Sequence, residues 1–384
     1  MMDSKSFIPR VRFKSCYNPW IIGPIGDFLD ERTERSSKGE LLSVTIDSGI
    51  VKARTLERKD NSSKDKSNYR VVRKNDIAYN SMRMWQGASG RSSYDGIVSP
   101  AYTVLLPKHG VSTRFFSYAF KQTKMLQVFQ SNSQGLTSDT WNLKFNLLKS
   151  IKVITPSLDE QEKIAEVLLK MDRLIVTSEK KVFELKRLKR LLLQNMFNRF
   201  WRFDGFTLPW EQRKLNDYLT ESLIKGSSGS NSKKLTVKLW GKGVVPKVNN
   251  WRKGSENTKY YVRHTGQLMY GKLDFLHAAF GIVPKSLNNF ESTIDSPAFD
   301  ISIKINSKFL LYSVLQRRFY VKQGSIANGS RKAKRVHEAT FLEMSIHVPE
   351  IKEQSRISGL LDIIENLIVA NERYPYQTKQ NNSR

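Results

Sequence analysis

The alternation of hydrophobic and polar positions predicts a mixed domain at the start of the chain. Segments 43–52 and 96–106 are rich in β-branched and aromatic residues, which indicates strands. Segment 114–130 has a helical pattern, and the polar stretch 131–140 is typical of a loop. Strands and helices occur within one domain, so we expect the α/β (α+β) fold class.

The next segment predicts a long helix with a coiled-coil seam. Ser157 and Glu160 have the spacing of a helix capping box, and Pro156 stands just before it. No Gly or Pro then interrupts the chain to about Phe200. Steps of four and three residues pick out a mostly apolar stripe: Ile164, Leu168, Met171, Ile175, Ser178, Val182, Leu185, Lys189, Leu192 and Met196.

A second helix is predicted from near Glu350. Its seam positions are Ile357, Leu361, Ile364 and Ile368. We expect Pro375 to end this helix, because proline lacks an amide hydrogen and clashes with the preceding turn. The second helix should therefore be much shorter than the first. These patterns place a first domain at 1–155, a spacer helix at 156–201, a second domain at 202–348, and a helix with a polar tail at 349–384.

The two halves of the chain repeat each other in fixed register. At an interval of 193 residues, Pro156, Glu160, Gln161, Ile164, Leu168 and Ile175 return as Pro349, Glu353, Gln354, Ile357, Leu361 and Ile368. At an interval of 190, Arg12, Phe13, Pro19, Trp20, Asp27, Leu29 and Glu31 return as Arg202, Phe203, Pro209, Trp210, Asp217, Leu219 and Glu221. A tandem duplication can approximate two-fold symmetry, and duplex DNA is a common two-fold partner.

Weaker similarities continue inside the two domains. Segment 43–44 with 49–51 resembles 236–237 with 243–245, and segment 99–102 resembles 296–299. Between these landmarks the spacing drifts and the residues differ. A shared scaffold with different loops suits a protein that reads two different half-sites.

The charge points to a polyanionic partner. Lys and Arg number 64 against 36 acidic residues, which gives a net charge of +28. A solvated basic surface or a membrane-surface protein is the alternative, but the excess is spread over both halves, which favours nucleic acid. Cys16 is the one cysteine, so neither disulfides nor thiolate metal clusters are expected. No apolar run approaches the ~20 residues of a membrane span and no signal peptide is evident, so we expect a cytoplasmic location.

Several motifs, in the same order in both halves, resemble one known family. The stretch Arg202, Phe203, Gly205, Phe206, Pro209, Trp210, Glu211, Gln212, Arg213, Lys214 and Leu215 looks like the domain-opening motif of the specificity (S) subunits of type I restriction–modification systems. Pro156, Glu160, Gln161 and Ile164, followed by Gln194, Met196 and Phe197, resemble the central region of that family. The resemblance covers nearly the whole chain.

The resemblance implies a specific function. Each domain would be a target recognition domain that reads one half of a bipartite, asymmetric DNA target in the major groove. The two helices would pair antiparallel as a spacer and as the docking platform for two methyltransferase (M) subunits. Those subunits bind S-adenosylmethionine and methylate adenine N6, and restriction (R) subunits use ATP and Mg to translocate and cut DNA. The family is bacterial and acts at the nucleoid, and its specificity subunit binds no cofactor.

One departure from the family concerns the second helix. In the family this helix continues through a Lys- and Leu-rich stretch much like 186–197. Here segment 373–376, which contains Pro375, interrupts it.

The residues themselves show no catalytic site. An Asp/Asn-Pro-Pro-aromatic motif of an adenine methyltransferase and a GxxxxGK[ST] phosphate loop are both missing, and the five histidines lack metal-ligand spacing. Acidic residues at the start of the first helix are explained by its dipole. A non-catalytic specificity subunit fits this pattern. A stand-alone nucleic-acid-binding regulator is the main alternative, and an enzyme acting alone on nucleic acid is disfavoured.

Three polar regions have suitable chemistry for contacts with DNA. Arg and Gln pair with guanine and adenine in the major groove, and aromatic side chains pack on bases or thymine methyls. The candidates in the first domain are Arg83, Trp85, Gln86, Arg91 and Tyr94 in a Gly- and Ser-rich loop, and Asn132, Ser133, Gln134, Thr137 and Ser138 in a second loop. The candidates in the second domain are Asn328, Ser330, Arg331, Lys332, Lys334 and Arg335.

The basic cluster on the first helix has two interpretations. It comprises Lys180, Lys181, Lys186, Arg187, Lys189 and Arg190. These side chains could face phosphates between the half-sites, or form the solvated outer face of a coiled coil. The seam beneath them is expected to be helix core and subunit-docking surface.

Overall fold

The computed structural model describes residues 6–57, 62–227, 233–247, 258–326 and 335–381, the last nine of these (373–381) by their backbone alone. The chain forms two compact units that meet within one long helix. One unit holds the chain up to Thr177, and the other holds Ser178–Gln377. Each unit mixes helices with short antiparallel strands, which confirms the expected α+β class.

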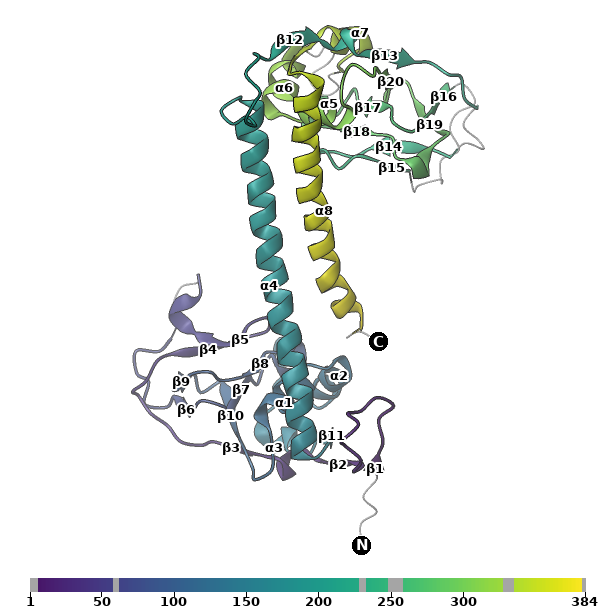
Figure 1. Ribbon diagram of the computed structural model, residues 1–384. Helices are drawn as coiled ribbons and strands as arrows, with labels where there is room; N and C mark the ends of the chain where they lie inside the picture. The colour runs from purple at the N-terminus through teal and green to yellow at the C-terminus, as the bar shows by residue number, and fades with distance from the viewer. Residues whose placement is uncertain (1–5, 58–61, 228–232, 248–257, 327–334, 382–384) are drawn as a thin grey trace. The chain divides into compact units, whose positions relative to one another are not determined.

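The first unit is built around a four-stranded antiparallel sheet of order β3-β10-β7-β8 (Figure 1). A three-stranded sheet β1-β2-β11 and the pairs β4-β5 and β6-β9 complete it. The strands are β1 (Ser6–Phe7), β2 (Trp20–Pro24), β3 (Leu29–Glu31), β4 (Leu42–Thr45), β5 (Gly49–Lys52), β6 (Arg70–Val72), β7 (Ile77–Asn80), β8 (Ser89–Arg91), β9 (Gly96–Val98), β10 (Tyr102–Pro107) and β11 (Lys152–Thr155). The helices are α1 (Thr113–Ala119), α2 (Thr123–Ser131), α3 (Phe145–Leu148) and the start of α4 (Leu158–Phe197).

The second unit repeats this plan with a sheet of order β13-β20-β17-β18 and the pairs β12-β21, β14-β15 and β16-β19. Its strands are β12 (Glu211–Lys214), β13 (Leu219–Ser222), β14 (Leu235–Val237), β15 (Val244–Pro246), β16 (Tyr260–Arg263), β17 (Leu268–Tyr270), β18 (Phe280–Ile282), β19 (Phe290–Thr293), β20 (Ala298–Ile301) and β21 (Ser345–Val348). Its helices are the end of α4 with α5 (Ser307–Val314), α6 (Arg317–Lys322), α7 (Glu338–Glu343) and α8 (Ile351–Asn381).

Strand pairing confirms the two sequence intervals. Ile21 of β2 lies opposite Thr155 of β11, and Glu211 of β12 lies opposite Val348 of β21. The step from Ile21 to Glu211 is 190 residues and the step from Thr155 to Val348 is 193, as in the sequence motifs. β2 and β12 are therefore equivalent strands, and each pairs with the strand that leads into the following long helix, β11 before α4 and β21 before α8.

The similarities inside the domains have different outcomes. Ser43 lies opposite Val51 and Thr236 lies opposite Val245, so the first match is confirmed. The match of 99–102 with 296–299 is wrong by three residues. Glu31 lies opposite Leu105, whereas its counterpart Glu221 lies opposite Phe299. Leu105 and Phe299 are both fully buried, so they are the equivalent positions of β10 and β20. The similar Ser-Pro-Ala-aromatic sequences aligned Phe299 with Tyr102 instead.

Two pairs of glycines help to explain why the β4–β5 hairpin and the β14–β15 hairpin match. A Cβ on Gly90 would lie 2.8 Å from Cα of Gly49, and one on Gly281 would lie 2.8 Å from Cα of Gly243. Gly49 and Gly243 have φ of +63° and +80°, a region that favours glycine. In each domain the turn of a hairpin thus packs backbone against backbone on a strand of the main sheet.

Four predicted elements differ from the expectation in length or continuity. Segments 43–52 and 96–106 each hold two strands, because turns at Gly49 and at Ser99–Pro100 interrupt them; the amide of Tyr102 bonds back to Ser99 O at 2.9 Å. Segment 114–130 is two helices, because Gln122 is extended at ψ 137°.

The expectation that Pro375 ends the second helix is wrong, since α8 continues to Asn381. The one backbone hydrogen bond that proline cannot form does not end the helix. At 31 residues, α8 is still shorter than the 40 residues of α4.

An ion pair joins each long helix to the segment that opens its domain. Arg12 donates from Nε and Nη2 to Glu160 at 3.0 and 2.5 Å, and Arg202 donates in the same way to Glu353 at 3.0 and 2.7 Å. Both carboxylates are buried, with exposed fractions of 1% and 0%. Glu160 also accepts from Nε1 of Trp20 at 3.0 Å. Glu160 therefore does not serve the capping box with Ser157 that its spacing predicted.

The glutamine that follows each of these carboxylates ties the helix to its own domain. Gln161 donates to Pro156 O at 2.9 Å and accepts from the amide of Ser112 at 2.8 Å. Gln354 donates to Pro349 O and accepts from the amide of Asn306, both at 2.8 Å. Ser112 and Asn306 are the N-caps of α1 and α5. We call the Arg–Glu pair with its glutamine the helix-root clamp; it gives the duplicated motifs a structural role.

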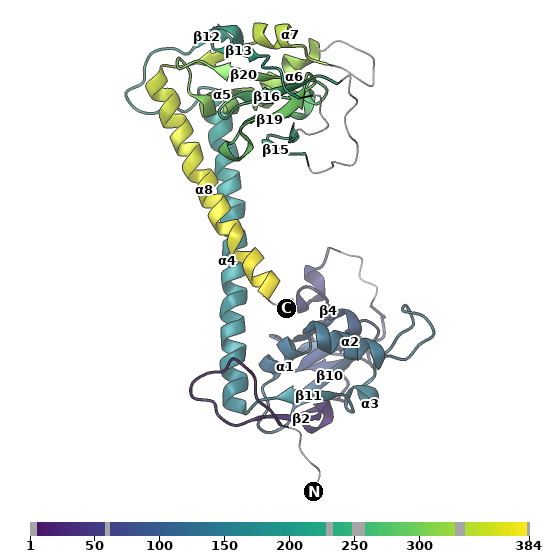
Figure 2. The same ribbon diagram turned by 90° about the vertical axis from the view of Figure 1, so that its right-hand side faces the viewer.

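Within the second unit, α8 runs alongside the C-terminal part of α4 in the opposite direction (Figures 1 and 2). Met196 and Phe197 of α4 share a core with Ile357 and Leu361 of α8. Ion pairs join Lys189 to Glu365 and, at 2.6 Å, Lys186 to Glu372. The two equivalent helices therefore pair antiparallel through apolar residues flanked by charges.

Candidate nucleic-acid interface

Two of the candidate loops of the first domain lie together. The rings of Trp85 and Trp141 meet edge to face with centroids 5.2 Å apart, and the amide of Leu143 bonds to Ser81 O at 2.8 Å. Trp85 lies in the short helix η3 (Met84–Gln86) rather than in an open loop, and its Nε1 donates to Met82 O at 3.2 Å. The tryptophan pair joins η3 to the end of the polar loop after α2.

Arg83 and Gln86 flank this tryptophan pair with available donors. Both side chains are half-buried, and neither forms a hydrogen bond or ion pair with any other described residue. Arg and Gln in this state can donate to base edges or phosphates. The sequence-based candidates Arg83, Trp85 and Gln86 therefore form one group in the structure.

The other two candidates of this region lie differently. Arg91 ends β8, and its guanidinium donates to the side chain of Asn75. Burial lowers the pKa of Arg91, with the nearby charge of Arg114 adding to this, and its Nε is shielded without an acceptor. Tyr94 lies under Lys52, whose Nζ is 5.1 Å from the ring centroid. Arg91 is thus largely engaged in the scaffold, and Tyr94 packs with the end of β5.

The polar loop after α2 is exposed and held by its own hydrogen bonds. A backbone bridge closes it, with Gln134 and Asn142 exchanging bonds of 3.0 and 2.8 Å. The hydroxyl of Thr140 accepts from the amide of Thr137 at 3.1 Å, and Leu136 at the tip is fully exposed. Ser133 is half-buried, and the other candidates here, Asn132, Gln134, Thr137 and Ser138, are exposed.

Most candidates of the second domain cannot be placed. Asn328, Ser330, Arg331, Lys332 and Lys334 lie outside the described residues. Arg335 is described, and its Nε lies 3.4 Å from Oδ1 of Asp295. The site predictions in this loop therefore stay predictions.

The second domain presents an aromatic residue that the sequence analysis did not identify. The β14–β15 hairpin turns at Trp240, whose φ of +59° is unusual for a bulky residue, and whose side chain is 59% exposed. The amides of Trp240 and Gly241 donate to the carbonyls of His277 and Ala278, each at 2.8 Å. The indole packs edge to face on the His277 ring at 5.6 Å. The sequence Lys-Leu-Trp-Gly-Lys-Gly between two strands was the available signal.

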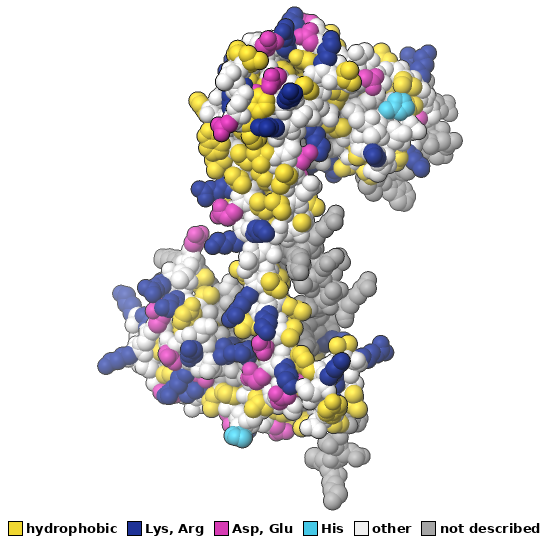
Figure 3. Space-filling model, in the orientation of Figure 1, with side chains coloured by type: hydrophobic (Ala, Val, Ile, Leu, Met, Phe, Trp, Pro, Cys, Tyr) yellow, Lys and Arg dark blue, Asp and Glu magenta, His cyan; other side chains and the backbone are white. Residues whose placement is uncertain are grey.

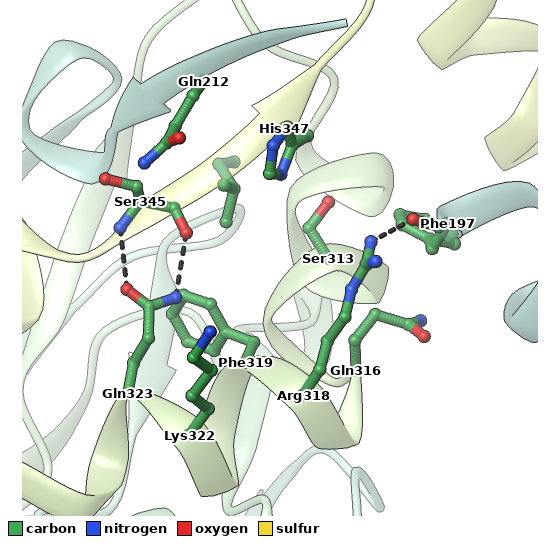
Figure 4. Close-up of a pocket in the computed structure, with 11 residues that line it drawn as sticks. Phe197, Gln212, Ser313, Gln316, Arg318, Phe319, Lys322, Gln323, Ser345 and His347 are labelled. Atoms are coloured by element: carbon green, nitrogen blue, oxygen red, sulfur yellow. Dashed lines mark hydrogen bonds between the residues drawn. The ribbon is translucent and has the colours of Figure 1, made fainter. Parts of the chain in front are cut away.

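A cavity of about 470 Å³ with polar and apolar lining residues lies where the end of α4 meets the second domain (Figure 4). Arg318 of α6 crosses it and donates to Phe197 O and, at 2.9 Å, to Oδ1 of Asn198. A cation here complements the carbonyl end of α4. On the other wall, the Gln323 amide exchanges two 2.9 Å bonds with the backbone of Ser345. Burial, with Arg199 and Arg318, lowers the pKa of His347.

The predicted seam positions differ in burial along the helices. Ile357, Leu361, Ile364 and Ile368 of α8 are buried, as is Met196 of α4. On α4, Ile164, Leu168, Ile175, Val182, Leu185 and Leu192 are half-buried, and Met171 is exposed. Of the basic cluster, Lys186 and Lys189 pair with α8, Arg187 pairs with Glu184 at 3.6 Å, and Lys180, Lys181 and Arg190 are exposed.

Basic side chains are spread over the visible surface of each unit (Figure 3). Among the described residues, no cluster of three or more His, Cys, Asp or Glu is placed to hold a metal ion. None of the described helices is long and apolar enough to cross a membrane. The described surface thus offers donors and cations for a polyanion.

Comparisons with known proteins agree with this arrangement. Residues 18–187 match the family described as the type I restriction modification DNA specificity domain. The specificity subunit of the type I restriction enzyme MjaIX of Methanocaldococcus jannaschii is 31% identical over 140 residues, which span 33% of this chain and 31% of that relative. The MjaVIII specificity subunit of the same organism is 23% identical over 327 residues, 78% of this chain and 74% of that relative.

Solved structures share the fold over almost the whole length. The S subunit of a type I restriction–modification system from M. genitalium has a TM-score of 0.59 at 13% identity, covering 98% of this chain and 97% of its own. The HsdS subunit from Thermoanaerobacter tengcongensis has a TM-score of 0.50 at 16% identity, covering 94% of each chain. The fold and its internal repeat are those of a duplicated two-domain protein. Residues 18–187 thus match the DNA specificity domain of type I restriction–modification systems, and the chain is similar over most of its length to a specificity subunit of such a system.

Proposed function

We propose that this chain is a specificity subunit that reads a bipartite, asymmetric DNA target, with one half-site for each recognition domain. The observation that carries the proposal is the repeated helix-root clamp, which presents two equivalent scaffolds with different exposed loops. The first domain offers Arg83, Gln86 and the polar loop after α2, and the second offers the exposed Trp240 hairpin with Lys238 and Lys242. Equivalent scaffolds with different loops read different bases.

The chain itself directs chemistry rather than performing it. We propose that two methyltransferase subunits dock on α4 and α8, bind S-adenosylmethionine and methylate adenine N6 at the site that this chain selects. Restriction subunits that use ATP and Mg would join them for cleavage, on DNA at the nucleoid. No observation favours the alternative of a stand-alone nucleic-acid-binding regulator.

The test is co-expression of this chain with its methyltransferase subunit, followed by mapping of N6-methyladenine across a host genome by long-read sequencing. A single split, asymmetric methylated motif supports the proposal. An assembled complex that adds no methylation at any motif overturns it. A chain that binds DNA but neither assembles with the methyltransferase nor changes methylation supports the stand-alone regulator.

A further inference from the structure

The hairpin turn at Trp240, here called the Trp240 tip, differs in chemistry from its counterpart in the first domain. The equivalent hairpin of the first domain turns through Ile46, Asp47 and Ser48, with one acidic residue and no aromatic residue. The hairpin of the second domain carries Trp240 between Lys238 and Lys242. Because the scaffold repeats and this tip does not, the tip is a candidate for a role specific to the second half-site.

The tip is rigidly held. Gly241, at φ +66°, lies against Leu315, where a Cβ would be only 2.9 Å from a methyl carbon. Gly243 makes the close approach to Gly281, and the two backbone bonds to His277 and Ala278 fix the other side. A bulky residue at positive φ on an exposed turn costs folding energy, and such strain commonly marks a functional position. The fold therefore keeps the Trp240 indole exposed although the positive φ is unfavourable for this residue.

Cationic side chains without partners surround the indole. A cavity of about 1090 Å³ beside the tip is lined by six Lys or Arg side chains and two carboxylates. The carboxylates Glu365 and Glu372 are paired with Lys189 and Lys186. The exposed side chains of Arg190, Lys242 and Arg317 form no ion pair with any carboxylate in the described part of the chain. Local charge therefore remains positive after pairing.

We propose that Trp240, with Arg190, Lys242 and Arg317, forms a DNA contact site of the second domain. The cations bind backbone phosphates, and the indole packs on the bases and sugars of the same stretch. Phosphates explain why these cations lack carboxylate partners, and aromatic packing on nucleotides explains an exposed, preorganised tryptophan. The inference rests on the proposed function, because it takes duplex DNA as the ligand.

The test measures binding of a fluorescein-labelled duplex that carries the mapped target, using the whole complex with its methyltransferase subunit. Trp240→Gly removes the indole and relieves the positive-φ strain, so its thermal midpoint should equal or exceed that of the wild type. Its affinity for DNA should fall by roughly tenfold. Trp240→Phe should retain part of the affinity. The matched control is Trp201→Ala, which removes another exposed tryptophan of the same unit.

The cations have a separate readout. The double variant Lys242→Ala and Arg317→Ala should reduce the slope of log affinity against log salt by about two, since each phosphate contact contributes about 0.9. Lys285→Ala, at an exposed position that does not line the cavity beside the tip, should leave the slope less changed. Full affinity of Trp240→Gly, or an unchanged slope of the double variant, overturns the inference alone. A wild-type complex that neither binds nor methylates DNA overturns the proposed function and the inference with it.

Discussion

At the scale of single residues, buried ionic contacts carry the repeated motifs. Arg202 is the one cation that pairs with the fully buried Glu353 among the described residues. Arg202→Ala should lower the free energy of unfolding of the second unit by about 3 kcal/mol, because it leaves a buried charge without a partner. Arg213→Ala, which breaks an exposed pair with Glu211, should lower the free energy of unfolding far less. Hydrogen exchange of the α8 amides measures the loss of stability in both variants. Equal losses in Arg202→Ala and Arg213→Ala would contradict a structural role of the clamp.

His347 should give the second unit an acid-sensitive component of stability. Its pKa in the folded chain is lowered from the ordinary value of 6.5. As pH falls below about 6.5, the unfolded chain therefore takes up the proton first, and stability decreases with pH. The contribution of neutral His347 to stability is fully present above a pH of about 6.5. His347→Gln should flatten the dependence of the thermal midpoint on pH; a profile parallel to that of the wild type would exclude the effect.

At the scale of elements, close backbone packing fixes where the hairpins lie. Gly281→Ala places a Cβ 2.8 Å from Cα of Gly243 and should destabilise the second unit by about 1–3 kcal/mol. Gly359→Ala, in α8 with open space around it, should stabilise by about 0.5–1 kcal/mol. Urea unfolding of the two variants should shift in opposite directions. A shift in the same direction would show that this backbone contact does not hold the hairpin.

The elements also show what the sequence could predict. The helices α4 and α8 followed from motifs that recur in register, because clamp residues and seam residues must keep their spacing. The division of 43–52 into two strands and of 114–130 into two helices could not be predicted in this way. The short turns at Gly49 and Gln122 depend on tertiary packing rather than on periodicity. The capping role of Glu160 was wrong because its partner Arg12 is 148 residues away.

The candidate site was less predictable than the fold. Arg83, Trp85 and Gln86 lie together as a polar group, but Arg91 has the same chemistry and is engaged by Asn75. Trp240 was missed because its exposure and positive φ are properties of the folded turn. Composition identifies residues able to contact DNA, whereas burial and pairing decide which of them are available.

At the scale of the whole molecule, the repeat implies interchangeable recognition domains. The equivalent helices α4 and α8 are each joined to their own domain by the same helix-root clamp. Segments 12–156 and 202–349 begin with Arg-Phe and end with Pro, so an exchange keeps both clamps. In a chain with 202–349 replaced by 12–156, Arg12 and the amide of Ser112 would meet Glu353 and Gln354. The chimaera then carries the first domain twice.

The most direct measurement is the N6-methyladenine motif that this chimaera directs when co-expressed with the methyltransferase subunit. If each domain reads one half-site, the wild type methylates a split asymmetric motif and the chimaera methylates an interrupted palindrome built from one of its halves. An assembled, active chimaera that retains the asymmetric wild-type motif would contradict the account.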